Sequence, residues 1–138
     1  MKKLFLISAF FAVNFPICFA QTSMELKNPT SCGITVQFYC SHSSCADEIS
    51  ISYSVAANSS INFTDPTALT FSYGGGSVAS TDTWDYALVT NTSGPYCPGI
   101  TIGPSGGCGS YATSGTFTCG CYTTWYWVAN GSNWEITP

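Results

Sequence analysis

The chain has 138 residues and a formal net charge of −4, with three lysine or arginine residues against seven acidic ones. Two of the three basic residues, Lys2 and Lys3, belong to an N-terminal segment that we expect to be cleaved, which leaves Lys27 as the only lysine and no arginine. Such a surface cannot neutralise a phosphate backbone or an anionic lipid layer, so nucleic acids and anionic membranes are excluded as expected partners.

Residues 1–20 have the organisation of a secretory signal peptide. A positively charged start is followed by an apolar stretch, Leu4 to Val13, and by small residues that end at Ala20. We therefore expect cleavage before Gln21 and a single mature domain, residues 21–138, that is secreted or periplasmic. No later stretch has the apolar length of a transmembrane helix, so membrane insertion is not expected.

Alternation of apolar and polar residues with a period of two dominates the rest of the chain and predicts β-strands. In chain order the expected strands are Ser23 to Lys27, Cys32 to Cys40, Ile49 to Val55, Ser60 to Phe63, Ala68 to Tyr73, Trp84 to Thr90, Gly99 to Ile102, and the run from Tyr111 onward. Turn residues separate these short segments. We therefore predict an all-β, antiparallel β-sandwich of roughly eight strands, immunoglobulin-like or jelly-roll, stapled by disulfides.

The C-terminal residues predict a tight hairpin, because Asn130-Gly131 is the pair that a two-residue type I′ turn favours. Pairing outward from that turn places Trp127 opposite Trp134, on a face that we expect to form part of the core. The residues of this inward face are Trp125, Trp127, Ala129, Ser132, Trp134 and Ile136. The expected wet or partner-facing side carries Tyr122, Tyr126, Val128 and Glu135.

Seven cysteines follow residue 20, and in an exported chain they are expected to form disulfides rather than metal or catalytic sites. They are Cys32, Cys40, Cys45, Cys97, Cys108, Cys119 and Cys121. The odd number predicts at most three bridges and one free thiol. Cys119 and Cys121 are too close to pair readily with each other, so we expect one of them to reach Cys32 and the other to be the free thiol. A buried free thiol is expected to be unreactive.

Local bridges are expected between Cys40 and Cys45 and between Cys97 and Cys108, because each pair brackets a loop rich in serine or glycine. The second bridge would pin the irregular stretch from Asn91 to Ser110. We interpret that stretch as a stapled surface loop, although sequence alone does not fix the connectivity.

Two groups of residues have the composition of catalytic or metal sites, and we interpret both as structural. The segment from Cys40 to Asp47 contains His42, but export favours oxidation of its thiols over metal binding, and no Gly-x-Ser-x-Gly motif accompanies the histidine. The pair Asp82 and Asp85 has the residue types of a glycosidase or calcium site, yet its spacing matches no calcium loop, and turn-capping aspartates with solvated carboxylates are expected instead. No metal, cofactor or enzymatic activity is therefore expected.

Aromatic residues make up 15% of the sequence and include four tryptophans. Exposed rings with hydroxyl and amide groups nearby can hold an uncharged sugar, whereas a small sandwich also fills its core with such rings. We assign Trp125, Trp127 and Trp134 to the core. The expected binding residues are Trp84, Tyr86, Tyr96 and Tyr126.

Two segments carry a resemblance to a known group of proteins. They are Asn28-Pro29-Thr30-Ser31-Cys32-Gly33-Ile34-Thr35-Val36 and Ser54-Val55-Ala56-Ala57-Asn58-Ser59-Ser60-Ile61. Both resemble small exported cysteine-containing β-sandwich proteins of Gram-negative bacteria with no assigned activity. The resemblance spans about the first half of the mature chain; it implies bacterial export and a sandwich, and it implies no binding or catalytic residue.

The function expected from the sequence is an exported, non-enzymatic binding or surface-interaction module that contacts a glycan or a protein. Carbohydrate binding through exposed aromatic rings is one specific alternative. Self-assembly as a structural or adhesive subunit is another, because Lys27 alone is available to protect an edge strand from pairing with another copy.

Overall fold

The structure is a computed structural model that describes residues 23–41, 47–73, 78–92, 97–105 and 108–138. The expected signal peptide, residues 1–20, lies outside the described residues, as do His42, Cys45 and Tyr96. No helix among the described residues is long and apolar enough to span a membrane.

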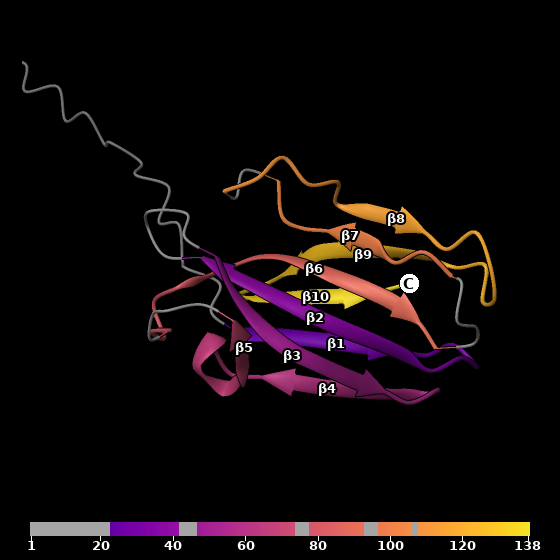
Figure 1. Cartoon of the computed structure of the whole chain (residues 1–138), viewed down its shortest axis with the longest axis horizontal. Coiled ribbons are helices and arrows are strands. Elements are labelled where there is room, and N and C mark those ends of the chain that lie inside the picture. Colours follow the sequence, from indigo (N-terminus) through magenta and orange to yellow (C-terminus); the bar gives the residue numbers. More distant parts are fainter. Residues whose placement is uncertain (1–22, 42–46, 74–77, 93–96, 106–107) are drawn as a thin grey trace, which may run out of the picture.

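The described chain forms ten β-strands and one short 3-10 helix (Figure 1). The strands are β1 (Ser23–Asn28), β2 (Ile34–Ser41), β3 (Asp47–Val55), β4 (Ser59–Phe63), β5 (Phe71–Tyr73), β6 (Thr83–Asn91), β7 (Ile100–Ile102), β8 (Ser114–Thr116), β9 (Thr124–Asn130) and β10 (Asn133–Thr137). The helix, η1 (Pro66–Ala68), is capped by Asp65, whose carboxylate accepts a hydrogen bond from the backbone N–H of Thr67. The sequence pattern assigned a strand to Ala68 to Tyr73, but Ala68 is the last residue of this helix and the strand begins at Phe71.

The strands form two five-stranded sheets, with the orders β4-β1-β10-β9-β8 and β5-β3-β2-β6-β7. We call these sheet A and sheet B. All the strand pairs described are antiparallel except β1 with β10, where Ser23 pairs with Asn133 and Leu26 with Ile136. The prediction of an all-β, antiparallel sandwich is therefore confirmed except for this one parallel pair, and the described residues form ten strands in place of roughly eight.

The core lies between the two sheets and is built from alternate residues of the central strands, as the period of two predicts. Along β2, for example, Ile34, Val36, Phe38 and Cys40 are buried, while the residues between them are half-buried. The other large core side chains include Met24, Leu26, Trp84, Ile102, Phe117, Trp125 and Ile136. Trp84 is 2% exposed and packs edge-on against Phe38, with ring centroids 5.3 Å apart. It is a core residue, so the expectation that it lies on a contact surface is wrong.

Strand β3 departs from the predicted alternation at a β-bulge. The pairing with β2 shifts between Gln37 and Tyr39, so that Ser50 and Ile51 together face Phe38. Ser50 is fully buried and its hydroxyl accepts a hydrogen bond from the backbone N–H of Phe38, whereas Ile51 is exposed. An apolar residue that the sequence pattern assigns to the core is therefore turned outward.

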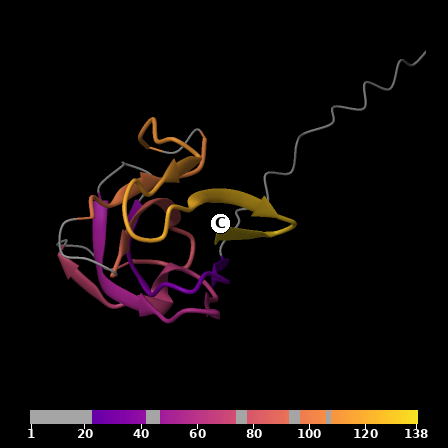
Figure 2. The same ribbon diagram turned by 90° about the vertical axis from the view of Figure 1, so that its right-hand side faces the viewer.

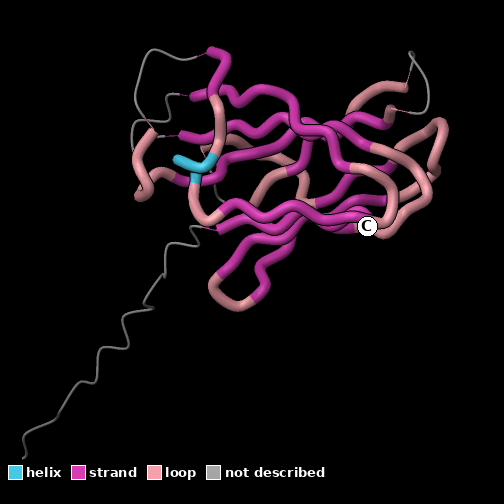
Figure 3. The backbone as a smooth tube through the Cα atoms, turned by 90° about the horizontal axis from the view of Figure 1, so that it is seen from below, coloured by secondary structure: helices cyan, strands magenta, loops and turns pink. Residues whose placement is uncertain are grey.

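The C-terminal hairpin has a different register from the predicted one, and its predicted faces hold only in part. Trp125, Trp127 and Ile136 are buried, but Ala129 and Ser132, predicted to face inward, are exposed near the hairpin tip, and Glu135, predicted on the wet side, is buried. Asn130 pairs with Asn133, so the two turn residues are Gly131 and Ser132, and only Gly131 has a positive φ, of 64°. A positive φ at the first turn position alone is typical of a type II′ turn, which does not require the Asn-Gly pair. Because the register shift preserves parity, Trp127 and Ile136 still face the core. The tip of this hairpin projects from the sandwich (Figures 2 and 3).

Candidate functional site

Four strand connections meet at one end of the sandwich, which we call the loop end. They are β1–β2 (29–33), β3–β4 (56–58), β6–β7 (described at Thr92 and 97–99) and β8–β9 (117–123). Figure 2 looks onto this end of the molecule. Hydrogen bonds join the connections to one another, because Asn58 N–H donates to the carbonyl of Thr30 and Thr92 N–H donates to the carbonyl of Gly33. The loops of a β-sandwich gather at its ends in this way, and such loops are frequent recognition surfaces.

Two disulfides tie the β8–β9 connection to its neighbours. Cys32 is bonded to Cys121, with Cα atoms 6.3 Å apart, and Cys97 is bonded to Cys119, with Cα atoms 5.7 Å apart. The first bridge confirms the prediction that Cys119 or Cys121 reaches Cys32. The second shows that the other member of the pair is not the free thiol, since the fold brings the end of the β6–β7 connection, just before β7, beside the β8–β9 connection.

The two predicted local bridges are not formed. Cys97 is bonded to Cys119 rather than to Cys108, and Cys40 is the one free cysteine among the described residues. Cys108 is itself in a disulfide. The pairing of Cys40 with Cys45 fails for a physical reason, because the alternation of β2 turns the Cys40 side chain into the core.

The free thiol of Cys40 is held in an unreactive form. Its pKa is raised to about 12, mainly by burial and to a smaller extent by the nearby carboxylates of Asp82 and Asp85, which disfavour a further negative charge. Because the thiolate is the nucleophile, a thiol with this pKa stays protonated and inert at neutral pH. The expectation of an inert buried thiol therefore holds for Cys40.

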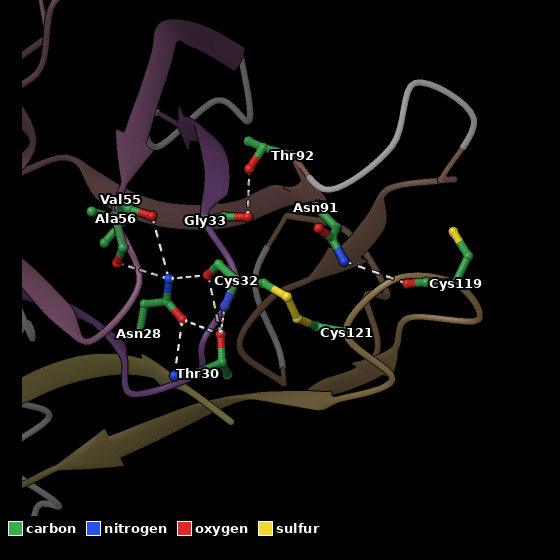
Figure 4. Close-up of a disulfide and its surroundings, with 10 residues drawn as sticks. All are labelled: Asn28, Thr30, Cys32, Gly33, Val55, Ala56, Asn91, Thr92, Cys119 and Cys121. Atoms are coloured by element: carbon green, nitrogen blue, oxygen red, sulfur yellow. Dashed lines mark hydrogen bonds between the residues drawn. A yellow bond between two sulfur atoms is a disulfide. The ribbon is translucent and has the colours of Figure 1, made fainter.

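A buried asparagine organises the loop end from beneath (Figure 4). Asn28 is fully buried, and its amide nitrogen lies 2.8 Å from the carbonyl oxygen of Cys32, 3.0 Å from that of Ala56 and 3.3 Å from that of Val55. Its amide oxygen accepts hydrogen bonds from the hydroxyl and the backbone N–H of Thr30, at 2.7 and 3.3 Å. One side chain thus fixes both the β1–β2 and the β3–β4 connections.

The β8–β9 connection is anchored at several points and presents one exposed ring. At its base, Phe117 is buried and its N–H donates to the carbonyl of Thr123 at 3.1 Å. The Asn91 side chain donates to the carbonyl of Cys119 at 3.4 Å, and Gly120 takes a positive φ of 68°. Tyr122 follows directly after the second disulfide-bonded cysteine and is 78% exposed, which makes it the most exposed large hydrophobic residue among those described.

The four predicted binding residues do not form one site. Trp84 is in the core, and Tyr96 lies outside the described residues. Tyr86 is half-buried and stacked between Tyr39 and Tyr111, with centroid distances of 4.0 and 4.1 Å, so both faces of its ring are covered. Tyr126 is 44% exposed on the outer face of sheet A.

Tyr122 was placed by the sequence pattern on the wet side of the C-terminal strand, without a binding role. The signal that singles it out is its position after Cys119-Gly120-Cys121, because two neighbouring cysteines that bond to different loops fix the backbone and leave the next side chain outside.

Sheet A carries an ion-pair network on its outer face. The Lys27 ammonium lies 3.0 Å from a carboxylate oxygen of Glu135 and 3.2 Å from one of Glu25. Desolvation acts to raise the pKa of Glu135, but hydrogen bonds from Lys27 and Asn130 outweigh it, and the pKa is lowered. Hydrogen bonds to Glu135 and Glu25 raise the pKa of Lys27. Lys27, the one basic side chain that the structure describes, is therefore paired with two carboxylates of the same sheet.

The aspartate pair has structural partners. Asp82 accepts a hydrogen bond from the backbone N–H of Ala79 at 2.7 Å, as a turn-capping aspartate does. Asp85 is buried rather than solvated and accepts a bond from the N–H of Cys108 at 2.9 Å. Among the described residues there is no group of three or more histidine, cysteine or acidic side chains arranged to hold a metal ion.

Comparison with known proteins gives no assignment. No protein-family profile matches the chain, no curated protein matches it significantly, and no solved structure does so. The loop end is therefore described by its own chemistry, which is one projecting aromatic ring on a backbone fixed by two disulfides, with hydroxyl and amide side chains on the neighbouring connections.

Proposed function

We propose that this protein is an exported, non-enzymatic binding module whose contact surface is the loop end, with Tyr122 as its central contact. The observation that carries the proposal is the 78% exposure of Tyr122 on a connection held by two disulfides. An aromatic ring costs free energy when it is left in water, and exposed tyrosines are enriched at recognition surfaces.

The rigidity of the connection supports a binding role. A mobile loop loses conformational freedom when it binds, and that loss reduces affinity. Here the bridges Cys32–Cys121 and Cys97–Cys119 have already restricted the backbone on either side of Gly120, so the ring is presented in advance of contact. Tyrosine adds large contact area for the ordering of only two side-chain torsions.

Export is supported by the signal-like sequence of residues 1–20 and by the disulfides, which persist in oxidising compartments.

Edge-to-edge self-assembly is less well supported. The terminal strands of the two sheets are short, since β5, β7 and β8 have three residues each and β4 has five. Very short edge strands are one means by which sandwich proteins avoid pairing with other copies.

The test is binding by the full chain, expressed with its own N-terminal segment and purified after processing. Its binding is measured by biolayer interferometry on immobilised polysaccharides (dextran, laminarin, galactomannan, alginate, heparin) and proteins (gelatin, serum albumin). Tyr122→Ala is compared with Tyr126→Ala, a matched removal of an exposed tyrosine from the outer face of sheet A. N-terminal sequencing of the same sample checks cleavage before Gln21.

We expect Tyr122→Ala to weaken binding to at least one surface by about tenfold or more, as truncation of a central aromatic contact does, and Tyr126→Ala to change it by less than about twofold. The proposal is refuted if no surface is bound in a manner that depends on Tyr122, or if the two variants lose binding equally.

A further inference from the structure

The loop end differs from the rest of the molecule in its charge. Among its described residues there is no aspartate, glutamate, lysine, arginine or histidine side chain. The exposed polar side chains there carry hydroxyl or amide groups instead, and they come from different connections: Ser31, Asn58, Thr92 and Thr118. Tyr122 supplies a projecting ring on the β8–β9 connection of the same end.

The acidic groups lie elsewhere. By their positions in the chain, one set of acidic residues stands near the opposite end of the sandwich, where β3 and β6 begin and where β4 ends: Asp47, Glu48, Asp65, Asp82 and Asp85. The other two carboxylates, Glu25 and Glu135, lie on the outer face of sheet A and share Lys27. The described acidic residues are therefore separated from the loop end, and Lys27, which stands two residues before the β1–β2 connection, is paired with two of them.

This separation limits the ligands that the loop end can accept. A charged group of a ligand that docks there loses its hydration and finds no opposite charge, which costs free energy. Typical protein surfaces present many charged residues, and electrostatic complementarity between partners normally compensates for their burial. A ligand without charges avoids this cost entirely.

A neutral sugar also matches the groups that are present. The face of a pyranose carries C–H groups that pack against an aromatic ring, and its hydroxyls both donate and accept hydrogen bonds. Serine and threonine hydroxyls and the asparagine amide can likewise do both. A protein interface of standard size would instead need an apolar core larger than one tyrosine ring.

We infer that the loop end binds a neutral polysaccharide, with the Tyr122 ring stacked on a sugar ring and the surrounding hydroxyl and amide side chains bonded to its hydroxyls. This inference rests on the proposed function and specifies its ligand. Individual sugar contacts are weak, so a preformed site is needed, and the two disulfides and the buried Asn28 amide provide one.

The experiment compares immobilised dextran, laminarin and galactomannan with alginate, heparin and gelatin, at about 20 mM and about 500 mM sodium chloride. We expect binding to at least one neutral polysaccharide that changes less than about twofold with salt, because no ion pair forms. Tyr122→Phe keeps the stacking face and should retain binding within about threefold, whereas Tyr122→Ala should lose about tenfold or more.

Tyr122-dependent binding that is confined to alginate, heparin or gelatin overturns this inference and leaves the proposed function standing. Tyr122-dependent dimer formation on a sizing column also overturns it, because the partner is then a second copy of the chain. If no binding depends on Tyr122, both the inference and the proposed function fail.

Discussion

The amide of Asn28 offers the sharpest test of how the loop end is held. Its NH2 group has two protons to share among three backbone carbonyl oxygens, those of Cys32, Val55 and Ala56, and its oxygen accepts two bonds from Thr30. Counting two donated and two accepted bonds at somewhat under 1 kcal/mol each, replacement by alanine should lower the free energy of unfolding by about 3 kcal/mol. That is a large part of the roughly 5–15 kcal/mol that stabilises a domain.

The assay is equilibrium unfolding in urea without reductant, followed by the fluorescence of the buried tryptophans Trp84, Trp125 and Trp127. The same loss should lower Tm by about 12 °C for a domain of this size. Asn28→Asp keeps the side-chain size and the acceptor oxygens but removes the N–H donors. It therefore distinguishes the contribution of the donated hydrogen bonds from that of the side-chain volume. The matched control is Asn62→Ala on the exposed face of β4, which should cost about 0.5 kcal/mol or less.

Two outcomes would contradict this account of Asn28. One is a cost below about 1 kcal/mol for Asn28→Ala, which would mean that the carbonyls find other donors. The other is a nearly wild-type Asn28→Asp variant, which would mean that the volume of the side chain matters and its donors do not.

Three further predictions concern the bridges, the free thiol and the ion pair. Replacing both cysteines of Cys32–Cys121 by alanine should lower the free energy of unfolding by about 4.6 kcal/mol, because this bridge closes a loop with a sequence separation of 89. The same change at Cys97–Cys119 should cost about 3.4 kcal/mol, because its sequence separation is 22. Unfolding in urea measures both costs, and the reverse order would contradict the entropic reasoning. The pKa of Cys40 is raised from 9.0 to about 12 in the folded state, so the unfolded chain loses this proton at a lower pH. The free energy of unfolding should therefore fall by up to about 4 kcal/mol as the pH rises through that range. Cys40→Ala should remove this part of the decline, and equal slopes of unfolding free energy against pH for the two proteins would refute the reasoning. The pKa of Glu135 is lowered in the folded state, so its contribution to stability is present at neutral pH and is lost on acidification. Glu135→Gln should therefore lower Tm by about 3 °C at pH 7 and cause no measurable change near pH 3, as checked by calorimetry at the two pH values.

The strands were predictable because one side of each sheet is buried, and burial imposes a period of two on the sequence. The alternation from Ile34 to Cys40 and the inward face of Trp125 and Trp127 follow from it directly. The bulge at Ser50 and the turn at Gly131 break the pattern, because each depends on how a partner strand aligns rather than on the residue types alone.

The candidate site was less predictable, since its parts are distant in sequence. Proximity along the chain favoured a bridge from Cys97 to Cys108, but the fold places Cys97 beside Cys119. Composition could not separate Trp84, which fills the core, from Tyr122, which projects from it, because both are aromatic residues near turns. Only the connectivity of the disulfides distinguishes the exposed ring.

The parallel pairing of β1 with β10 has a consequence for how the chain acquires its structure. Met24 lies beside Trp134 and Leu26 beside Ile136, so the first strand of sheet A has its inner neighbour only when the last strand has been made. Cys32 likewise waits for Cys121. During synthesis sheet A therefore stays incomplete until β10 has been made. Sheet A is then completed with this long-range pairing as the slow step.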